Sequence, residues 1–198
     1  MPPVIRLACE DDAELIQAIY APIVRDTAIS FEMDVPTVPE MRRRITNTLE
    51  SLPWLVCENQ RDILGYAYGG PHRARTAYQW SVEVSVYVKD DARRLGVGRA
   101  VYRSLFDLLA LQGFWNAYAG ITLPNPASVG LHESMGFRTV GIYRKVGYKF
   151  GRWHDVGWWQ LPLREEEGVP ESPTRLPSAA GSTAWNAAMG KGLPSLHL

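Results

Sequence analysis

The stretch Arg93-Arg94-Leu95-Gly96-Val97-Gly98 decides how this chain is interpreted. It follows a segment of alternating residues, 81–88, and opens a run, 97–112, in which apolar residues recur at helical spacing. A strand, a glycine turn and a helix in this order can bind pyrophosphate. Glycine lets the backbone approach an anion closely, and the first N–H groups of the helix point at that anion. The spacing is neither the dinucleotide fingerprint nor the Walker pattern.

The bulk composition limits the classes of protein that this chain can belong to. Its 198 residues suffice for one α/β domain, and 21 basic residues balance 21 acidic ones, which argues against a broad nucleic-acid surface. The two cysteines, Cys9 and Cys57, match no metal spacing, and we expect no metal. Apolar runs are too short to cross a membrane and no signal peptide is evident, so we expect a cytoplasmic protein that does not bind membranes.

Hydrophobic periodicity predicts a chain that alternates between strands and helices. The predicted strands cover 4–8, 54–58, 63–70, 81–88, 115–123, 137–143 and 153–163, and the predicted helices cover 11–23, 37–49, 97–112 and 128–135. We therefore expect a single domain over residues 1–164.

The composition changes after that domain. An acidic run at 165–167 leads into three prolines and then into a segment rich in glycine, serine and alanine. No periodic apolar face continues there, so we expect residues 165–198 to form a disordered tail. Trp185 and Met189 leave open the alternative of a docking segment.

Several short motifs accompany the glycine loop. They are Tyr78-x-Trp80-x-Val82-Glu83, Leu123-Pro124-Asn125, Leu131-His132-Glu133, and Gly147-Tyr148-Lys149 through Trp153-His154-Asp155-Val156. In this order and spacing the chain resembles the GNAT superfamily, and within it the phosphinothricin N-acetyltransferases and their amino-acid-detoxifying relatives. The resemblance runs from about Ile5 to Leu163.

The resemblance implies an α/β (α+β) fold with a mixed central sheet, flanked by helices, in which two parallel strands splay apart. Acetyl-coenzyme A would enter between the strands that end near Val88 and Leu123. The residues implied in binding it are Val86, Tyr87 and Val88 for the acetyl and pantetheine groups, Arg93, Arg94, Leu95, Gly96, Val97 and Gly98 for the pyrophosphate, and Asn125 for the pantetheine arm. The resemblance also implies a homodimer.

Two residues are candidates for proton transfer. Acetyl transfer needs a neutral amine, and a carboxylate near the acceptor can take its proton. Glu83 occupies a strand position that would favour an apolar residue, and the family places its proposed base there; the alternative is an exposed residue paired with Lys89 or an arginine. His132 stands where many GNAT enzymes have a tyrosine, and it is a general acid, an acceptor ligand or a structural residue.

In this subgroup the acceptor is a small amino acid with an oxygen-rich tetrahedral side chain, such as phosphinothricin, methionine sulfoximine or methionine sulfone. Arg73 and Arg75 offer charged forks for its anionic groups, unless they belong to a solvated loop. Phe31, Tyr68 and Tyr78 are candidates for the pocket walls.

Two other functions remain open. A protein Nα-acetyltransferase would need an open peptide groove, and a coenzyme A-binding regulatory module would bind the cofactor without turnover. Resemblance to herbicide- and antibiotic-resistance enzymes leaves the physiological acceptor undetermined.

Overall fold

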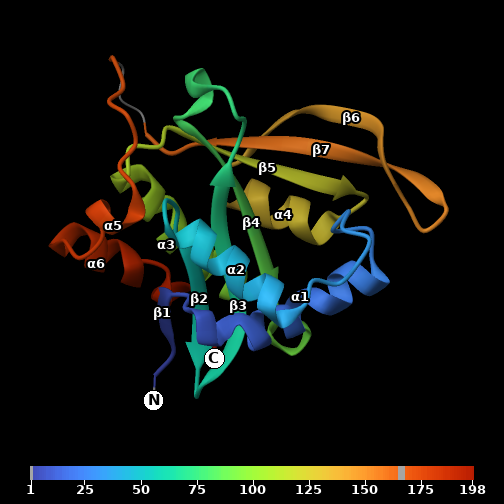
Figure 1. Cartoon of the computed structure of the whole chain (residues 1–198), viewed down its shortest axis with the longest axis horizontal. Coiled ribbons are helices and arrows are strands. Elements are labelled where there is room, and N and C mark those ends of the chain that lie inside the picture. Colours follow the sequence, from blue (N-terminus) through green and yellow to red (C-terminus); the bar gives the residue numbers. More distant parts are fainter. Residues whose placement is uncertain (1, 165–167) are drawn as a thin grey trace.

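A computed structural model describes residues 2–164 and 168–198. Its centre is a seven-stranded sheet in the order β1-β2-β3-β4-β5-β7-β6 (Figure 1). The strands are β1 (Val4–Leu7), β2 (Trp54–Asn59), β3 (Asp62–Pro71), β4 (Ser81–Val88), β5 (Asn116–Leu123), β6 (Arg138–Lys149) and β7 (Arg152–Pro162). The α-helices are α1 (Ala13–Asp26), α2 (Val38–Leu49), α3 (Val97–Leu111), α4 (Pro126–Ser134), α5 (Leu176–Ala179) and α6 (Thr183–Gly190). The predicted mixed α/β fold is confirmed.

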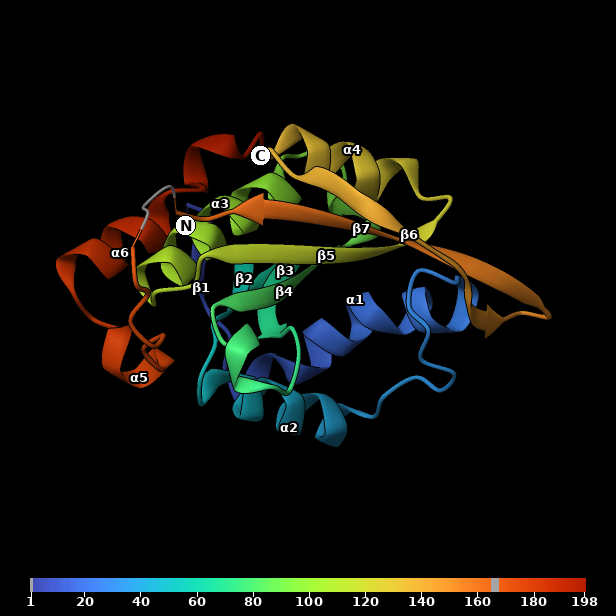
Figure 2. The same ribbon diagram turned by 90° about the horizontal axis from the view of Figure 1, so that it is seen from above.

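The helices form layers on both faces of the sheet. Figure 2 shows α1 and α2 on one side and α3 and α4 on the other. Each face has its own apolar cluster, because alternate side chains of a strand point to opposite faces. On β4, Val82 and Val84 belong to the cluster under α3, whereas Tyr87 packs on the cluster under α1 and α2.

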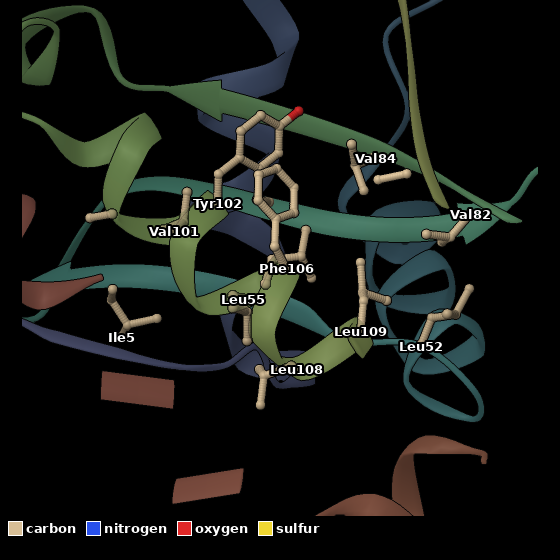
Figure 3. Packing of buried hydrophobic residues seen from close by; sticks show 14 of the residues in the cluster. Ile5, Leu52, Leu55, Val82, Val84, Val101, Tyr102, Phe106, Leu108 and Leu109 are labelled. Atoms are coloured by element: carbon tan, nitrogen blue, oxygen red, sulfur yellow. The ribbon is translucent and has the colours of Figure 1, made fainter. Parts of the chain in front are cut away.

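Helix α3 supplies much of the core on its side of the sheet. Val101, Tyr102, Leu105, Leu108 and Leu109 are all fully buried. Figure 3 shows several of these side chains interlocking with residues from β1, β2 and β4. This packing fixes the position of the helix N-terminus relative to β4.

Strands β4 and β5 are the one parallel pair among the described residues, and they separate soon after they begin. Only three residue pairs are in register, from Ser81↔Asn116 to Glu83↔Tyr118. Beyond that point β4 stays paired with β3, and β5 stays paired with β7. The backbone groups of Val84–Val88 that point toward β5 therefore lack a strand partner, and a V-shaped opening lies between the two strands.

Strand β6 is longer than the sequence pattern predicts, whereas β7 has the predicted length and is shifted by one residue. The two strands continue through residues 144–152 as a hairpin with irregular register between Tyr143 and Gly147. The hairpin exposes large apolar side chains, including Tyr148 and Trp153. Because Lys149 is the one buried residue of 144–152, this part of the hairpin has no continuous buried face, and its sequence lacks the alternation that marks a half-buried strand.

The prediction of a disordered C-terminal tail is wrong for residues 168–198; residues 165–167 lie outside the described part of the chain. Helices α5 and α6 pack beside α3, and Leu176, Trp185 and Ala188 are buried in the same cluster as the core of α3. The Ser182 side chain caps α6 by accepting a hydrogen bond from the Trp185 N–H at 3.1 Å. The composition of this segment indicates disorder because it contains few large apolar side chains. Those few side chains are nevertheless sufficient, because they pack on the apolar surface of α3.

We expect the tail to contribute to stability. Trp185 is 3% exposed, and replacing a buried tryptophan by alanine removes apolar contacts and leaves a cavity. Trp185→Ala should lower the free energy of unfolding by about 3–5 kcal/mol, measured by urea denaturation. The exposed neighbour Asn186 provides the control, since Asn186→Ala should change little. Equal stability of both variants and the wild type would show that the tail does not pack in solution.

No helix in residues 2–164 or 168–198 is long and apolar enough to cross a membrane.

Candidate functional site

The opening between β4 and β5 contains a cavity of ≈ 60 Å³. Residues from both strands and from α4 line it, among them Val86, Tyr87, Asn125 and His132. Asn125 caps α4, because its Oδ1 accepts a hydrogen bond from the Ser128 N–H at 3.1 Å. The cap uses the carbonyl of this side chain, so its amide group is available to a bound molecule.

The glycine loop lies at the open end of the V, where β4 leads into α3. Arg94 and Gly96 adopt left-handed backbone conformations, with φ of 65° and 78°. At Gly98 an added Cβ would lie 3.1 Å from Leu131, so this glycine lets α3 pack closely against α4. Arg93 pairs with Asp90 at 3.1 Å on the surface. The first N–H groups of α3 lack intrahelical acceptors and provide a site that suits a phosphate.

Glu83 lies at the vertex of the V, in the last residue pair that β4 forms with β5. Its Oε1 is 3.0 Å from Nδ1 of His72. A carboxylate can only accept, so the imidazole donates this hydrogen bond. The His72 ring stacks on Tyr118 with centroids 4.5 Å apart, which fixes its orientation. The Glu83 side chain remains 37% exposed, so it is both oriented by His72 and accessible to a substrate.

His132 is 3% exposed, and both of its ring nitrogens have partners. Nδ1 lies 2.8 Å from the Ser128 carbonyl oxygen and must donate, because a carbonyl only accepts. Burial lowers the pKa of His132, which favours the neutral ring, so Nε2 accepts from the Tyr102 hydroxyl at 3.0 Å. With both nitrogens engaged, His132 links α3 to α4 beside the cavity and offers no free N–H to a substrate.

Phe31 lies in the loop between α1 and α2, against the β6–β7 hairpin. Its ring fills the space beside Gly147, where any side chain would clash with it. Lys149 holds this loop, because its buried Nζ donates to the carbonyl oxygens of Val24 at 2.7 Å and Ser30 at 2.8 Å. Burial lowers the pKa of Lys149. The hairpin therefore positions the loop that carries Phe31.

Tyr68 lines a larger cavity of ≈ 580 Å³ between α2 and strands β2 and β3. The ring stacks on Trp54 with centroids 4.3 Å apart. Gly70 also lines this cavity and is the register partner of Glu83. The cavity therefore reaches the strand pair that carries Glu83, on the face covered by α2.

Arg73 and Arg75 lie on the connection between β3 and β4, and both are exposed. The same connection carries His72 at one end and Tyr78 at the other, and the His72 and Tyr78 rings meet edge to face with centroids 6.0 Å apart. Because His72 contacts Glu83, this connection lies over the vertex of the V. The two arginines lie on this connection, one and three residues after the histidine that contacts Glu83.

Sequence reasoning missed three members of the site. The sequence pattern indicates no role for His72, although it is the partner of Glu83. Tyr102 and Lys149 were not assigned roles, although each organises a segment next to the V. A tyrosine on the apolar face of a helix gives no sign in the sequence of a distant hydrogen-bond partner, and the same holds for a lysine in an exposed hairpin.

The GNAT acetyltransferase domain model matches residues 5–158 of this chain. The chain belongs to the GNAT acetyltransferases. It is an N-acetyltransferase by this match and by its relatives. The resemblance proposed from the short motifs is confirmed.

Two curated relatives indicate the subgroup within the GNAT family. Phosphinothricin N-acetyltransferase of Streptomyces coelicolor is 42% identical over 173 residues, covering 80% of this chain and 95% of the relative. The L-methionine sulfoximine/L-methionine sulfone acetyltransferase of Pseudomonas aeruginosa is 36% identical over 168 residues, covering 84% and 98%.

Two solved GNAT structures match closely as well. A phosphinothricin acetyltransferase from Sinorhizobium meliloti in complex with acetyl-coenzyme A has a TM-score of 0.81 at 33% identity, covering 86% of this chain and 94% of that one. A structure described as ribosomal-protein-alanine N-acetyltransferase from Brucella melitensis has a TM-score of 0.78 at 34% identity, covering 80% and 99%.

Proposed function

We propose that this GNAT enzyme transfers the acetyl group of acetyl-coenzyme A to the α-amino group of a small amino acid. The acceptors that we favour are phosphinothricin, methionine sulfoximine and methionine sulfone, on which the named relatives act.

The observation that carries the proposal is the V between β4 and β5. Its open end faces the glycine loop and the N-terminus of α3, and its vertex holds Glu83. The cofactor phosphates would bind at the open end, through the N–H groups of Val97 and Gly98. The unpaired edge of Val86, Tyr87 and Val88 would bind the pantetheine arm together with the Asn125 amide. A thioester bound this way would lie toward Glu83.

Glu83 would act as the general base. The acceptor amine is mostly protonated at neutral pH, and only its neutral form has a free electron pair. The Glu83 carboxylate takes a proton from the ammonium group, directly or through one water. The amine nitrogen then attacks the thioester carbonyl carbon, the C–N bond forms and the C–S bond breaks. His72 holds the carboxylate in place and does not touch the reacting atoms.

The chain must also stabilise the negative charge that develops during transfer. We propose that a backbone N–H on the unpaired edge of β4, between Val84 and Val88, donates a hydrogen bond to the thioester carbonyl oxygen. The nitrogen loses a second proton when the amide forms, and this proton finally resides on the coenzyme A sulfur, which leaves as a thiol. The first proton, held by Glu83, passes to solvent. His132 and Tyr102 line the cavity, and burial raises the pKa of Tyr102, so its hydroxyl stays protonated. These two residues would shape the site of the thiol without supplying a free proton.

Arg73 and Arg75 would bind the anionic groups of the acceptor from the connection above the vertex. Phe31, Tyr68 and Tyr78 would wall the pocket. Tyr78 contacts His72, Tyr68 faces the cavity that reaches Gly70, and Phe31 is held by the hairpin.

The proposal also includes a homodimer. The exposed apolar side chains of the β6–β7 hairpin provide a surface for a second copy: Val140, Ile142, Tyr143, Val146, Tyr148, Phe150 and Trp153.

Protein Nα-acetylation is the rival function, because one of the similar solved structures is described as a ribosomal-protein-alanine N-acetyltransferase. A regulatory module that binds coenzyme A without turnover is the alternative from another class.

Thiol release separates catalysis from mere cofactor binding. We expect free coenzyme A to accumulate with acetyl-coenzyme A and phosphinothricin, and mass spectrometry should find one acetyl group on the acceptor. Without an acceptor, release should be near the spontaneous rate of thioester hydrolysis. Cofactor binding with no acceptor-dependent release across a panel of amino acids and peptides would favour the regulatory module.

A further inference from the structure

The last residues of the chain pack directly against the glycine loop. The His197 N–H donates to the carbonyl oxygen of Leu95 at 3.0 Å. The Ser195 carbonyl oxygen lies 1.8 Å from the place that a Cβ of Gly96 would occupy. Two features therefore require glycine at position 96: the close approach of Ser195 and the left-handed φ of 78°. The family match ends at residue 158, so the C-terminal segment that makes this contact lies outside the matched region.

Two polar contacts seat this segment on α3. Ser104, fully buried in α3, donates from its Oγ to the Met189 carbonyl oxygen at 2.8 Å and accepts from the Gly192 N–H at 3.1 Å. Gly192 lies so close to α3 that a Cβ there would be 1.8 Å from the Ala100 carbonyl oxygen. The segment is therefore anchored to α3 at two places, which lie one and two helical turns beyond the glycine loop. Its last residues then reach the loop itself.

The orientation of the Leu95–Gly96 peptide shows which side of the loop the segment occupies. This peptide is trans, and in a trans peptide the C=O and N–H groups point in opposite directions. Because the Leu95 carbonyl points at His197, the Gly96 N–H points away from the C-terminal segment. The segment therefore supports the loop from behind and leaves this N–H free to face an anion.

We propose that residues 192–198 act as a brace that holds the glycine loop in its phosphate-binding conformation. This inference rests on the proposed function, in which the loop binds the pyrophosphate of coenzyme A. Without the brace, the loop would have to be ordered when the cofactor binds, and part of the binding free energy would be lost. Leu95, Gly96 and His197 are thus positioning residues for cofactor binding.

Two glycines near the end of α6 allow a matched test in the full chain. Gly192→Ala places a Cβ against the backbone of α3, whereas a Cβ on Gly190 meets nothing within 4 Å. A truncation that removes residues 194–198 eliminates the contact without a new side chain. The Kd for coenzyme A is measured by calorimetry, and KM for acetyl-coenzyme A, KM for the acceptor and kcat are measured in parallel, with the melting temperature as a folding control.

We expect Gly192→Ala and the truncation to raise the Kd for coenzyme A about tenfold (about 1.4 kcal/mol), and Gly190→Ala to leave it unchanged. KM for acetyl-coenzyme A should rise in step, while kcat and the acceptor KM stay close to wild type. A folded truncated protein with wild-type affinity would overturn the proposal, and so would tighter binding, which would indicate an autoinhibitory contact. Failure of the wild type to bind coenzyme A would instead overturn the proposed function.

Discussion

Glu83→Gln is expected to lower kcat with phosphinothricin by about 10²- to 10⁴-fold, the usual cost of losing a general base. Glutamine has nearly the same shape, and its amide oxygen can still accept the hydrogen bond from His72 that the carboxylate accepts at 3.0 Å. It cannot take a proton from the acceptor. The measurement is kcat at several pH values, together with the Kd for coenzyme A, which should stay near the wild-type value.

A variant of the neighbouring histidine separates chemistry from geometry at this position. His72→Asn removes the ring that stacks on Tyr118 and holds the carboxylate, but it leaves the base in the site. We therefore expect a smaller loss of kcat than for Glu83→Gln. Wild-type kcat at neutral pH in Glu83→Gln would show that another group, or bulk water, removes the proton.

Replacing Arg73 or Arg75 by alanine is expected to raise the acceptor KM by roughly ten- to a hundredfold. A guanidinium fork paired with a desolvated carboxylate or phosphinate contributes about 1.5–3 kcal/mol. KM for acetyl-coenzyme A should hardly change, because the arginines lie on the connection that carries His72, the partner of Glu83, and the cofactor phosphates would bind at the other end of the V. Steady-state kinetics with each substrate varied in turn measures both constants.

Lysine substitutions and a distant arginine serve as controls for this test. Lysine keeps the charge but loses the paired geometry, so it should restore the acceptor KM only in part. Arg25 is exposed and pairs with Asp26 at the C-terminal end of α1, which lies apart from the β3–β4 connection in Figures 1 and 2, so Arg25→Ala should leave the acceptor KM nearly unchanged. An unchanged acceptor KM in both Arg73→Ala and Arg75→Ala would place these arginines in a solvated loop and favour an open peptide groove.

The sequence was sufficient to predict the features that local patterns encode. The alternation of 81–88 and the helical spacing of 97–112 predicted β4 and α3, and the glycines predicted a turn between them, in which the structure shows Gly96 in a left-handed conformation. The family resemblance then implied the splayed parallel pair, which the register of β4 and β5 confirms. These predictions succeeded because a buried strand and an amphipathic helix each leave a periodic trace in the sequence.

Contacts between distant residues could not be predicted in the same way. The pairing of His72 with Glu83 depends on how a loop folds back over a strand, and no spacing rule describes it. The packing of α6 depends on Trp185 and Ala188 meeting α3, and a helix of eight residues is too short for a periodic signal. One indication was available: α3 carries serine at position 104, on a face that the tail covers, and a buried polar side chain needs a partner.

The acceptor class can be tested most directly by comparing kcat/KM for free amino acids with kcat/KM for peptides that carry a free N-terminus. The test uses wild-type protein, saturating acetyl-coenzyme A, and phosphinothricin, methionine sulfoximine and an alanine-terminated peptide as acceptors. We predict that kcat/KM for phosphinothricin or methionine sulfoximine exceeds that for the peptide, because in our proposal Arg73 and Arg75 bind the α-carboxylate that a peptide lacks at this position. A peptide with the higher kcat/KM would contradict the assignment of a small amino acid as the acceptor.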